Sequence, residues 1–218
     1  MLTLEKSHSQ AFTLLQALFG EKRVRAAIGR LNEIHHRTET IWEEYVRMLP
    51  GGAVKFLLIA EAPPWSVDGA PQYVLDPNSR PRTLMRALRG AFDLSKGLDA
   101  SEALAELARR GFLVVDSSPF SMDYSGKRSS LKYQRLIDVT AITYLKRKLS
   151  HSSLSWDREV RVAFCFKRNG EAVISALNGQ LMLGRLHRAV DRTAIAANGA
   201  GYPDAGKLKA IYGIETGV

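Results

Sequence analysis

The chain has 218 residues, of which 45% are hydrophobic and 24% are charged, a balance typical of a soluble globular domain. Its 31 Lys and Arg residues against 22 Asp and Glu give a net charge of +9, which favours an anionic partner such as nucleic acid. A single cysteine excludes an intramolecular disulfide and any zinc or iron–sulfur site built from four cysteines. Because no apolar stretch approaches ~20 residues and the first residues do not resemble a secretory signal, we expect a cytoplasmic protein.

Two helices are expected over residues 9–49. Apolar residues recur there at helical spacing, first around Leu15 and again around Trp42. Gly20 is expected to separate the two helices, and the Pro-Gly-Gly sequence of residues 50–52 to end the second one.

The strands predicted over residues 54–60 and 112–116 share one pattern. Each is an apolar run that ends in or beside a carboxylate and is followed by a loop containing proline. Continuous apolar runs fit strands that are buried on both faces of a parallel sheet, and ligands bind such sheets beyond the carboxyl ends of the strands. We therefore expect Glu61 and Asp116 to lie at one edge of the sheet, on strands about 4.8 Å apart if they are neighbours.

A long loop and two helices are expected between these strands. The loop covers residues 63–78, and Ser79 is the expected N-cap of a helix over residues 82–92. Asp99 and Glu102 have the spacing of a capping box ahead of the second helix.

The second half of the chain continues the alternation of helices and strands, which implies right-handed βαβ units and a mainly parallel four-stranded sheet. We expect one α/β domain over residues 1–218, with a helical part at 1–50 and a core at 53–212. The remaining expected elements are a helix over 129–149, a strand over 160–166, a helix over 171–177 capped by Asn169 and Gly170, a strand over 193–197 and a helix over 204–212.

Short motifs at the strand ends resemble those of the uracil-DNA glycosylase superfamily. Residues 60–64, Ala-Glu-Ala-Pro-Pro, are similar to the Gly-Glu-Ala-Pro-Gly motif that ends the first strand in one class of these proteins. Asp116 matches the polar residue after the family's second strand, and Gly-Tyr-Pro at 201–203 stands where the family has a His-Pro-Ser type loop. The resemblance covers residues 53–212. It implies a three-layer α/β/α fold with a four-stranded parallel sheet, DNA binding and hydrolysis of an N-glycosidic bond.

Several residues depart from the family pattern. The single cysteine cannot hold the iron–sulfur cluster that usually accompanies the Gly-Glu-Ala-Pro-Gly motif, and the last loop has no histidine. Ala62 stands where another class has its water-activating aspartate. Asp116 replaces the asparagine that contacts the base in many members, and a carboxylate only accepts hydrogen bonds where an amide also donates. The base preference and the catalytic activity therefore stay open.

The candidate catalytic residues are Glu61, which would orient a water molecule, and Asp116, which would contact the base or take that same role. The alternative is that each carboxylate caps a turn. Trp65 and Tyr73 are candidates for stacking on a base, or else they hold their own loop against the core. The other candidate binding residues are Ala62, Pro63, Lys127, Arg128, Asn198 and Tyr202.

Cations follow the second strand at the same edge of the predicted sheet and suit phosphate contacts, unless they form only a solvated surface. They are Lys127, Arg128, Lys132 and Arg135. A second basic stripe contains Arg82, Arg86 and Arg89. The histidines have no metal-ligand spacing, so we expect neither a metal nor a cofactor.

The leading hypothesis is a uracil-DNA glycosylase-like protein that binds DNA and hydrolyses the bond to a damaged or deaminated base. One alternative is a non-catalytic nucleic-acid-binding member of the same fold. Another is an N-ribosyl hydrolase that acts on a free nucleotide. The strandedness of the DNA and the oligomeric state are left open.

Overall fold

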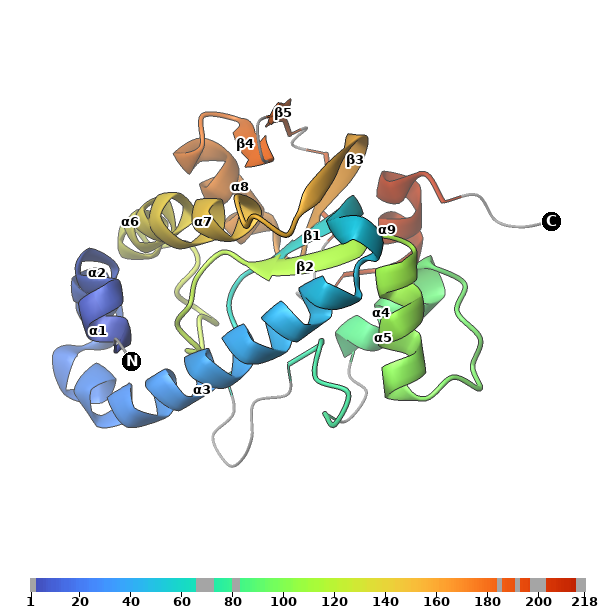
Figure 1. Ribbon diagram of the computed structural model, residues 1–218. Coiled ribbons are helices and arrows are strands. Elements are labelled where there is room, and N and C mark those ends of the chain that lie inside the picture. Colours follow the sequence, from blue (N-terminus) through green and yellow to red (C-terminus); the bar gives the residue numbers. More distant parts are fainter. Residues whose placement is uncertain are drawn as a thin grey trace.

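The computed structural model of the protein describes residues 3–65, 73–79, 83–183, 186–190, 193–196 and 203–214 (Figure 1). A small parallel sheet lies at its centre, and helices from both halves of the chain surround it. The elements in chain order are α1 (Leu4–Ser7), α2 (Ser9–Phe19), α3 (Glu21–Met48), η1 (Pro50–Gly52), β1 (Ala53–Ala60), α4 (Thr83–Ala91), α5 (Ala100–Arg109), β2 (Phe112–Asp116), α6 (Leu131–Thr140), η2 (Ala141–Leu145), α7 (Lys146–Leu149), β3 (Ser155–Phe164), α8 (Lys167–Ala176), β4 (Gln180–Leu183), β5 (Leu186–Ala189) and α9 (Ala205–Tyr212).

The two helices predicted before the first strand are confirmed as α2 and α3. Gly20 separates them with a φ of 91°, a conformation that glycine adopts without a steric penalty. Gly52, with a φ of 72°, brings the chain into β1, and an added Cβ there would lie 1.9 Å from the carbonyl oxygen of Ser153. Only a glycine therefore fits the turn between α3 and the sheet.

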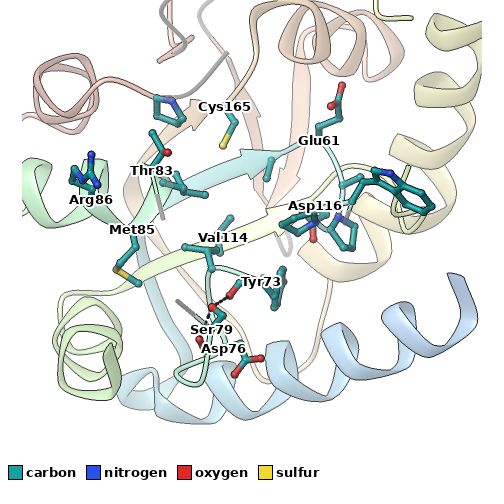
Figure 2. A pocket seen from close by; sticks show the side chains of 18 of the residues that line it. Glu61, Tyr73, Asp76, Ser79, Thr83, Met85, Arg86, Val114, Asp116 and Cys165 are labelled. Carbon is teal, nitrogen blue, oxygen red and sulfur yellow. Dashed lines mark hydrogen bonds between the residues drawn. The ribbon is translucent and has the colours of Figure 1, made fainter. Parts of the chain in front are cut away.

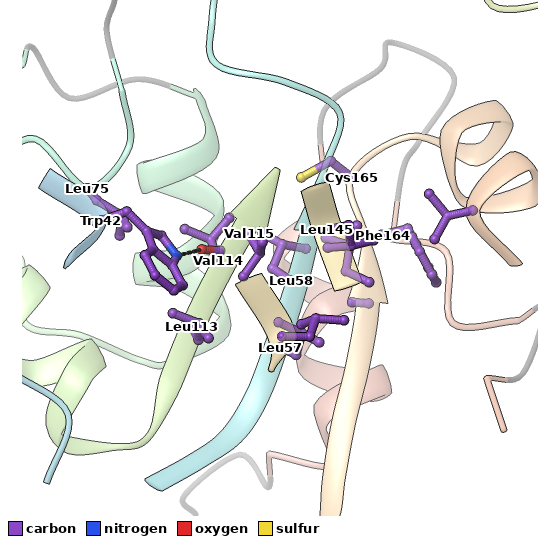
Figure 3. Close-up of a cluster of buried hydrophobic side chains, with 14 of the residues drawn as sticks. Trp42, Leu57, Leu58, Leu75, Leu113, Val114, Val115, Leu145, Phe164 and Cys165 are labelled. Atoms are coloured by element: carbon purple, nitrogen blue, oxygen red, sulfur yellow. Dashed lines mark hydrogen bonds between the residues drawn. The ribbon is translucent and has the colours of Figure 1, made fainter. Parts of the chain in front are cut away.

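The α/β class and the mainly parallel sheet are confirmed. The sheet has the strand order β2-β1-β3, and both neighbours of β1 run parallel to it. Every residue of β2 is buried, and in β1 Leu57, Leu58 and Ile59 are buried, as expected for strands covered on both faces. Figure 3 shows how Leu57, Leu58, Val114 and Val115 from these strands contribute to the central core.

Helix α3 covers the outer edge of β2, the edge strand of the described sheet. The indole nitrogen of Trp42 donates a 3.1 Å hydrogen bond to the Val114 carbonyl, and the Tyr45 hydroxyl donates a 3.0 Å bond to the Phe112 carbonyl. These carbonyls have no strand partner on that side, so side chains of α3 take the place of a further strand.

The predicted four-stranded sheet is not confirmed. Within the described residues the parallel sheet has three strands, and the segment predicted as a strand over 193–197 makes a single parallel bridge between Ile195 and Phe164. Residue 197, the last of that predicted strand, lies outside the described residues. The strand predicted over 160–166 is observed as β3 (Ser155–Phe164). It begins earlier than predicted because its polar first half still pairs with Ala53 and Val54 of β1, and it ends two residues earlier.

The prediction that Asn169 and Gly170 cap a helix was wrong. Both lie inside α8, where Asn169 is buried and donates hydrogen bonds to other elements. Gly170 packs so closely that an added Cβ would lie 2.9 Å from the ring of Phe164. The helix predicted over 129–149 contains a π-helical turn, η2, between α6 and α7.

The capping box of Asp99 and Glu102 is confirmed at the start of α5. The hydroxyl of Ser79 donates to the carbonyls of Tyr73 and Asp76, and the residues that it would cap as the predicted N-cap of α4 lie outside the described ones. Among the described helices, none combines the length and the apolar composition that crossing a membrane requires.

Candidate functional site

The first two strands bring Glu61 and Asp116 to the same edge of the sheet. Asp116 pairs with Ala60, and the ladder continues past the strands, because Ser118 donates from its backbone to the Glu61 carbonyl at 3.0 Å. Cys165 reaches the same edge from the end of β3. This edge is the carboxyl end of all three parallel strands, as the two apolar runs predicted.

A cavity of about 920 Å³ opens at this edge (Figure 2). Most of the predicted site residues line it together, and α4 contributes a wall that the sequence did not predict. The predicted residues in its lining are Glu61, Ala62, Pro63, Trp65, Tyr73, Arg86, Arg89, Asp116 and Arg128, and the additional ones that matter below are Cys165 and Phe166. Lys127 does not line the cavity, and Asn198 and Tyr202 lie outside the described residues.

Asp116 is a buried carboxyl group without a partner. Its side chain is 5% exposed, and no group in the described part of the chain donates a hydrogen bond to it. Burial raises the pKa of Asp116 from 3.8 to about 7, although the positive charge of Lys148 opposes the rise. The group therefore exchanges a proton near neutral pH while it faces a cavity of ligand size.

Glu61 has the opposite environment. The Arg128 guanidinium donates to both carboxylate oxygens, from Nε at 2.8 Å and from Nη2 at 2.6 Å, and the Tyr133 hydroxyl donates a 2.6 Å hydrogen bond to Oε1. Arg128 in turn lies 4.3 Å from the centre of the Phe166 ring. Figure 2 shows the Glu61 side chain directed away from Asp116, so the two carboxyls do not meet across one small site. Hydrogen bonds from Arg128 and Tyr133 therefore hold the Glu61 carboxyl in place.

Sequence reasoning missed Asn169, which supports this arrangement from α8. Its amide nitrogen donates to the Ser117 hydroxyl at 2.8 Å and to the Tyr133 hydroxyl at 3.2 Å. The Ser117 hydroxyl donates to the Glu61 carbonyl at 2.9 Å. An Asn-Gly pair is a usual signal for a turn, and nothing in the sequence marks this asparagine as buried.

A buried ion pair lies behind Asp116, on the side of α3 and α7. Lys148 Nζ lies 2.7 Å from a Glu39 carboxylate oxygen and 3.8 Å from the centre of the Trp42 ring, and the Lys148 side chain is 5% exposed. Trp42 is bonded to β2 only two residues before Asp116. The pair is therefore part of the electrostatic environment of Asp116, with Lys148 buried and Glu39 partly exposed.

The two aromatic candidates differ in their contacts. Tyr73 is 4% exposed, and burial together with the nearby Asp116 charge raises its pKa well above the ordinary value. Its hydroxyl makes no hydrogen bond to any described group. Trp65 is half-buried, and the Arg30 guanidinium lies 5.3 Å from the centre of its ring. Tyr73 thus adds a second polar group without a partner to the cavity wall.

The predicted cations divide into structural and available groups. Arg128 holds Glu61, and Arg89 donates to the carbonyls of Leu98 and Asp99, each at 2.9 Å. Arg86 lines the cavity and is exposed, and Lys127 is half-buried. Neither makes a hydrogen bond or ion pair with the described part of the protein. The others are exposed Lys132 and Arg135 on α6, and Arg82, which lies outside the described residues.

No protein-family model, no curated protein and no solved structure matches this chain. Within the described residues, no group of three or more His, Cys, Asp or Glu side chains is placed to hold a metal ion. The chemistry of the cavity is therefore argued from its own residues.

Proposed function

We propose that the protein binds nucleic acid and holds one nucleobase in the cavity at the carboxyl edge of the sheet, with Asp116 contacting the base. The observation that carries this proposal is Asp116 itself, a buried carboxyl that has no hydrogen-bond partner among the described residues and faces a cavity of about 920 Å³. Burying such a group has a cost, which a ligand that supplies hydrogen-bond donors would offset.

The surroundings of Asp116 fit a base and its attached phosphate. Tyr73, Trp65 and Phe166 give the cavity aromatic walls, and aromatic side chains hold bases that have left the stack. Arg86 offers a cation at the cavity wall, in a chain with a net charge of +9. The resemblance to the uracil-DNA glycosylase superfamily supports DNA as the form of nucleic acid.

N-glycosidic hydrolysis is the second candidate, favoured by the environment of Asp116. A carboxyl whose pKa lies near 7 can act as the general acid that protonates the leaving base when a glycosidic bond is cleaved. In this reaction a water oxygen would bond to the sugar carbon as the bond to the base nitrogen breaks. The electron pair would leave with the base, to which Asp116 would give its proton, and the attacking water would lose a proton to solvent. Glu61 would act by holding Arg128 and the strand end in position.

The test is the binding of labelled single-stranded and double-stranded oligonucleotides at several salt concentrations. We expect affinity to fall steeply between about 50 and 200 mM salt, as counterion release requires. Arg86→Glu and Lys127→Glu should weaken binding to every sequence and flatten the salt dependence. Lys55→Glu is the matched control, because Lys55 is an exposed cation near the amino end of β1, away from the cavity. Equal affinities of all these variants and the unchanged protein would contradict the proposal.

A panel of oligonucleotides with modified bases, assayed in a single turnover, separates the two candidates. Release of a base that is lost in Asp116→Asn while binding persists would establish hydrolysis. Salt-sensitive binding with no release from any substrate would leave the non-catalytic function. Binding of free nucleotides without binding of oligonucleotides would instead support the nucleotide-specific alternative.

A further inference from the structure

We propose that the cavity selects guanine, with Asp116 accepting hydrogen bonds from two adjacent donors of the base and Tyr73 donating to the neighbouring oxygen. This inference rests on the proposed function, since it names the base that the cavity would hold. It differs from the uracil expectation that the family resemblance carries.

Two hydrogen-bonding groups of the cavity wall are unpaired within the described part of the chain. The Asp116 carboxyl and the Tyr73 hydroxyl both line the cavity, and neither has a hydrogen-bond partner in the described structure. They lie near each other, because the charge of Asp116 contributes to the rise of the Tyr73 pKa, and Figure 2 shows both on the same side of the cavity. An ionised carboxylate accepts through both oxygens, and a phenol donates once.

Guanine matches this set of groups along one edge. It presents the O6 acceptor, then the N1–H donor, then the N2 amino donor. Uracil places an oxygen on each side of a single N–H, so one of its oxygens would face a carboxylate oxygen. Adenine and cytosine each present one amino donor beside a ring nitrogen that only accepts. Guanine alone among the four gives a carboxylate two adjacent donors and leaves an acceptor for the tyrosine.

The opposite side of the cavity suits the rest of a nucleotide. Arg86 projects from α4, and Figure 2 places it across the cavity from Asp116. A cationic ligand would also satisfy the Asp116 carboxylate, but the exposed arginine and the net charge of +9 disfavour one. A guanine carrying a phosphate satisfies both sides at once, whether it is a free nucleotide or part of a strand.

The pairing has a pH dependence with a defined sign. Two donors bind the ionised form of Asp116, so affinity for guanine should rise as pH rises through about 7, the pKa of the empty site. The ionisation of Asp116 also depends on the charged and titratable groups around it. Those that interact electrostatically with Asp116 are Glu39, Glu61, Tyr73, Tyr144, Lys148 and Cys165.

Three nucleotides that share O6 and N1–H and carry different groups at position 2 of the purine test the inference. GMP has an amino donor there, IMP a hydrogen and XMP an oxygen. Calorimetry at about pH 8 should give the order GMP, IMP, XMP, with about a tenfold step for loss of the second donor. In Asp116→Asn the amide should reverse the order, since its NH₂ donates to the XMP oxygen and opposes the GMP amino group.

Tyr73→Phe is the matched control for this series. All three nucleotides keep O6, so the variant should weaken them by a similar factor and leave their order unchanged. A thermal unfolding transition recorded for each variant shows that it is folded. Single-stranded oligothymidine with one central guanine, hypoxanthine or xanthine distinguishes a base within a strand from a free nucleotide.

The outcomes separate this inference from the function on which it rests. Equal affinity for GMP and XMP, or an order unchanged in Asp116→Asn, overturns guanine selection by Asp116. Salt-sensitive binding of oligonucleotides in that case leaves the proposed function standing. Failure of every nucleotide and every oligonucleotide to bind overturns both.

Discussion

Replacing Asp116 by asparagine should stabilise the protein above neutral pH, although it should impair the site. In the folded protein the pKa of Asp116 is about 7, against 3.8 ordinarily. A folded pKa above the unfolded value means that the folded state holds the proton more tightly, so stability falls as pH rises from about 4 to about 7. At about 1.4 kcal/mol per pH unit the full cost above pH 7 is roughly 4 kcal/mol, an upper bound because the structure relaxes around a buried charge. An amide of the same shape carries no charge and escapes this cost.

The assay is denaturant unfolding of both proteins between about pH 4 and pH 8. The stability advantage of Asp116→Asn should be small at the acidic end and grow toward the upper bound at the alkaline end. Glu33→Gln is the matched control, since Glu33 is exposed and has no partner in the described structure, and its effect should be small and constant. A loss of stability in Asp116→Asn at every pH would refute the reasoning, because it would mean that the protein holds the ionised carboxylate with favourable contacts.

Three further changes test the environment of the site and the packing around it. Lys148→Met removes the positive charge that lowers the pKa of Asp116, so that pKa should move further above 7. An NMR titration of the Asp116 carboxyl carbon measures it, and an unchanged pKa in the variant would contradict the coupling between the two groups. Burial among aromatic rings lowers the pKa of His8 from 6.5 to about 4, so the free energy of unfolding should fall by up to roughly 3 kcal/mol as the pH drops between those values. In His8→Phe, acid unfolding curves should no longer show this loss. Gly170→Ala should destabilise the protein by roughly 1–3 kcal/mol in denaturant unfolding, because its Cβ would lie 2.9 Å from the Phe164 ring; an unchanged transition midpoint would show that the ring yields freely.

The sequence by itself determined the elements whose signals are local. The apolar runs predicted β1 and β2, Gly20 separated α2 from α3, and the Asp99 capping box marked the start of α5. Each of these features depends on residues a few positions apart along the chain. The placement of Glu61 and Asp116 at one edge also followed, because parallel strands bring their carboxyl ends together.

Only the tertiary structure decided the different environments of the Glu61 and Asp116 carboxyls. Glu61 is held by Arg128, 67 positions further along the chain, whereas Asp116 is buried and has no hydrogen-bond partner among the residues that the structure describes. The sequence shows the same residue class in both places, but ionisation depends on burial and on charges that folding brings near. The misassigned Asn169 has the same explanation, since its partners Ser117 and Tyr133 come from segments far away in the sequence.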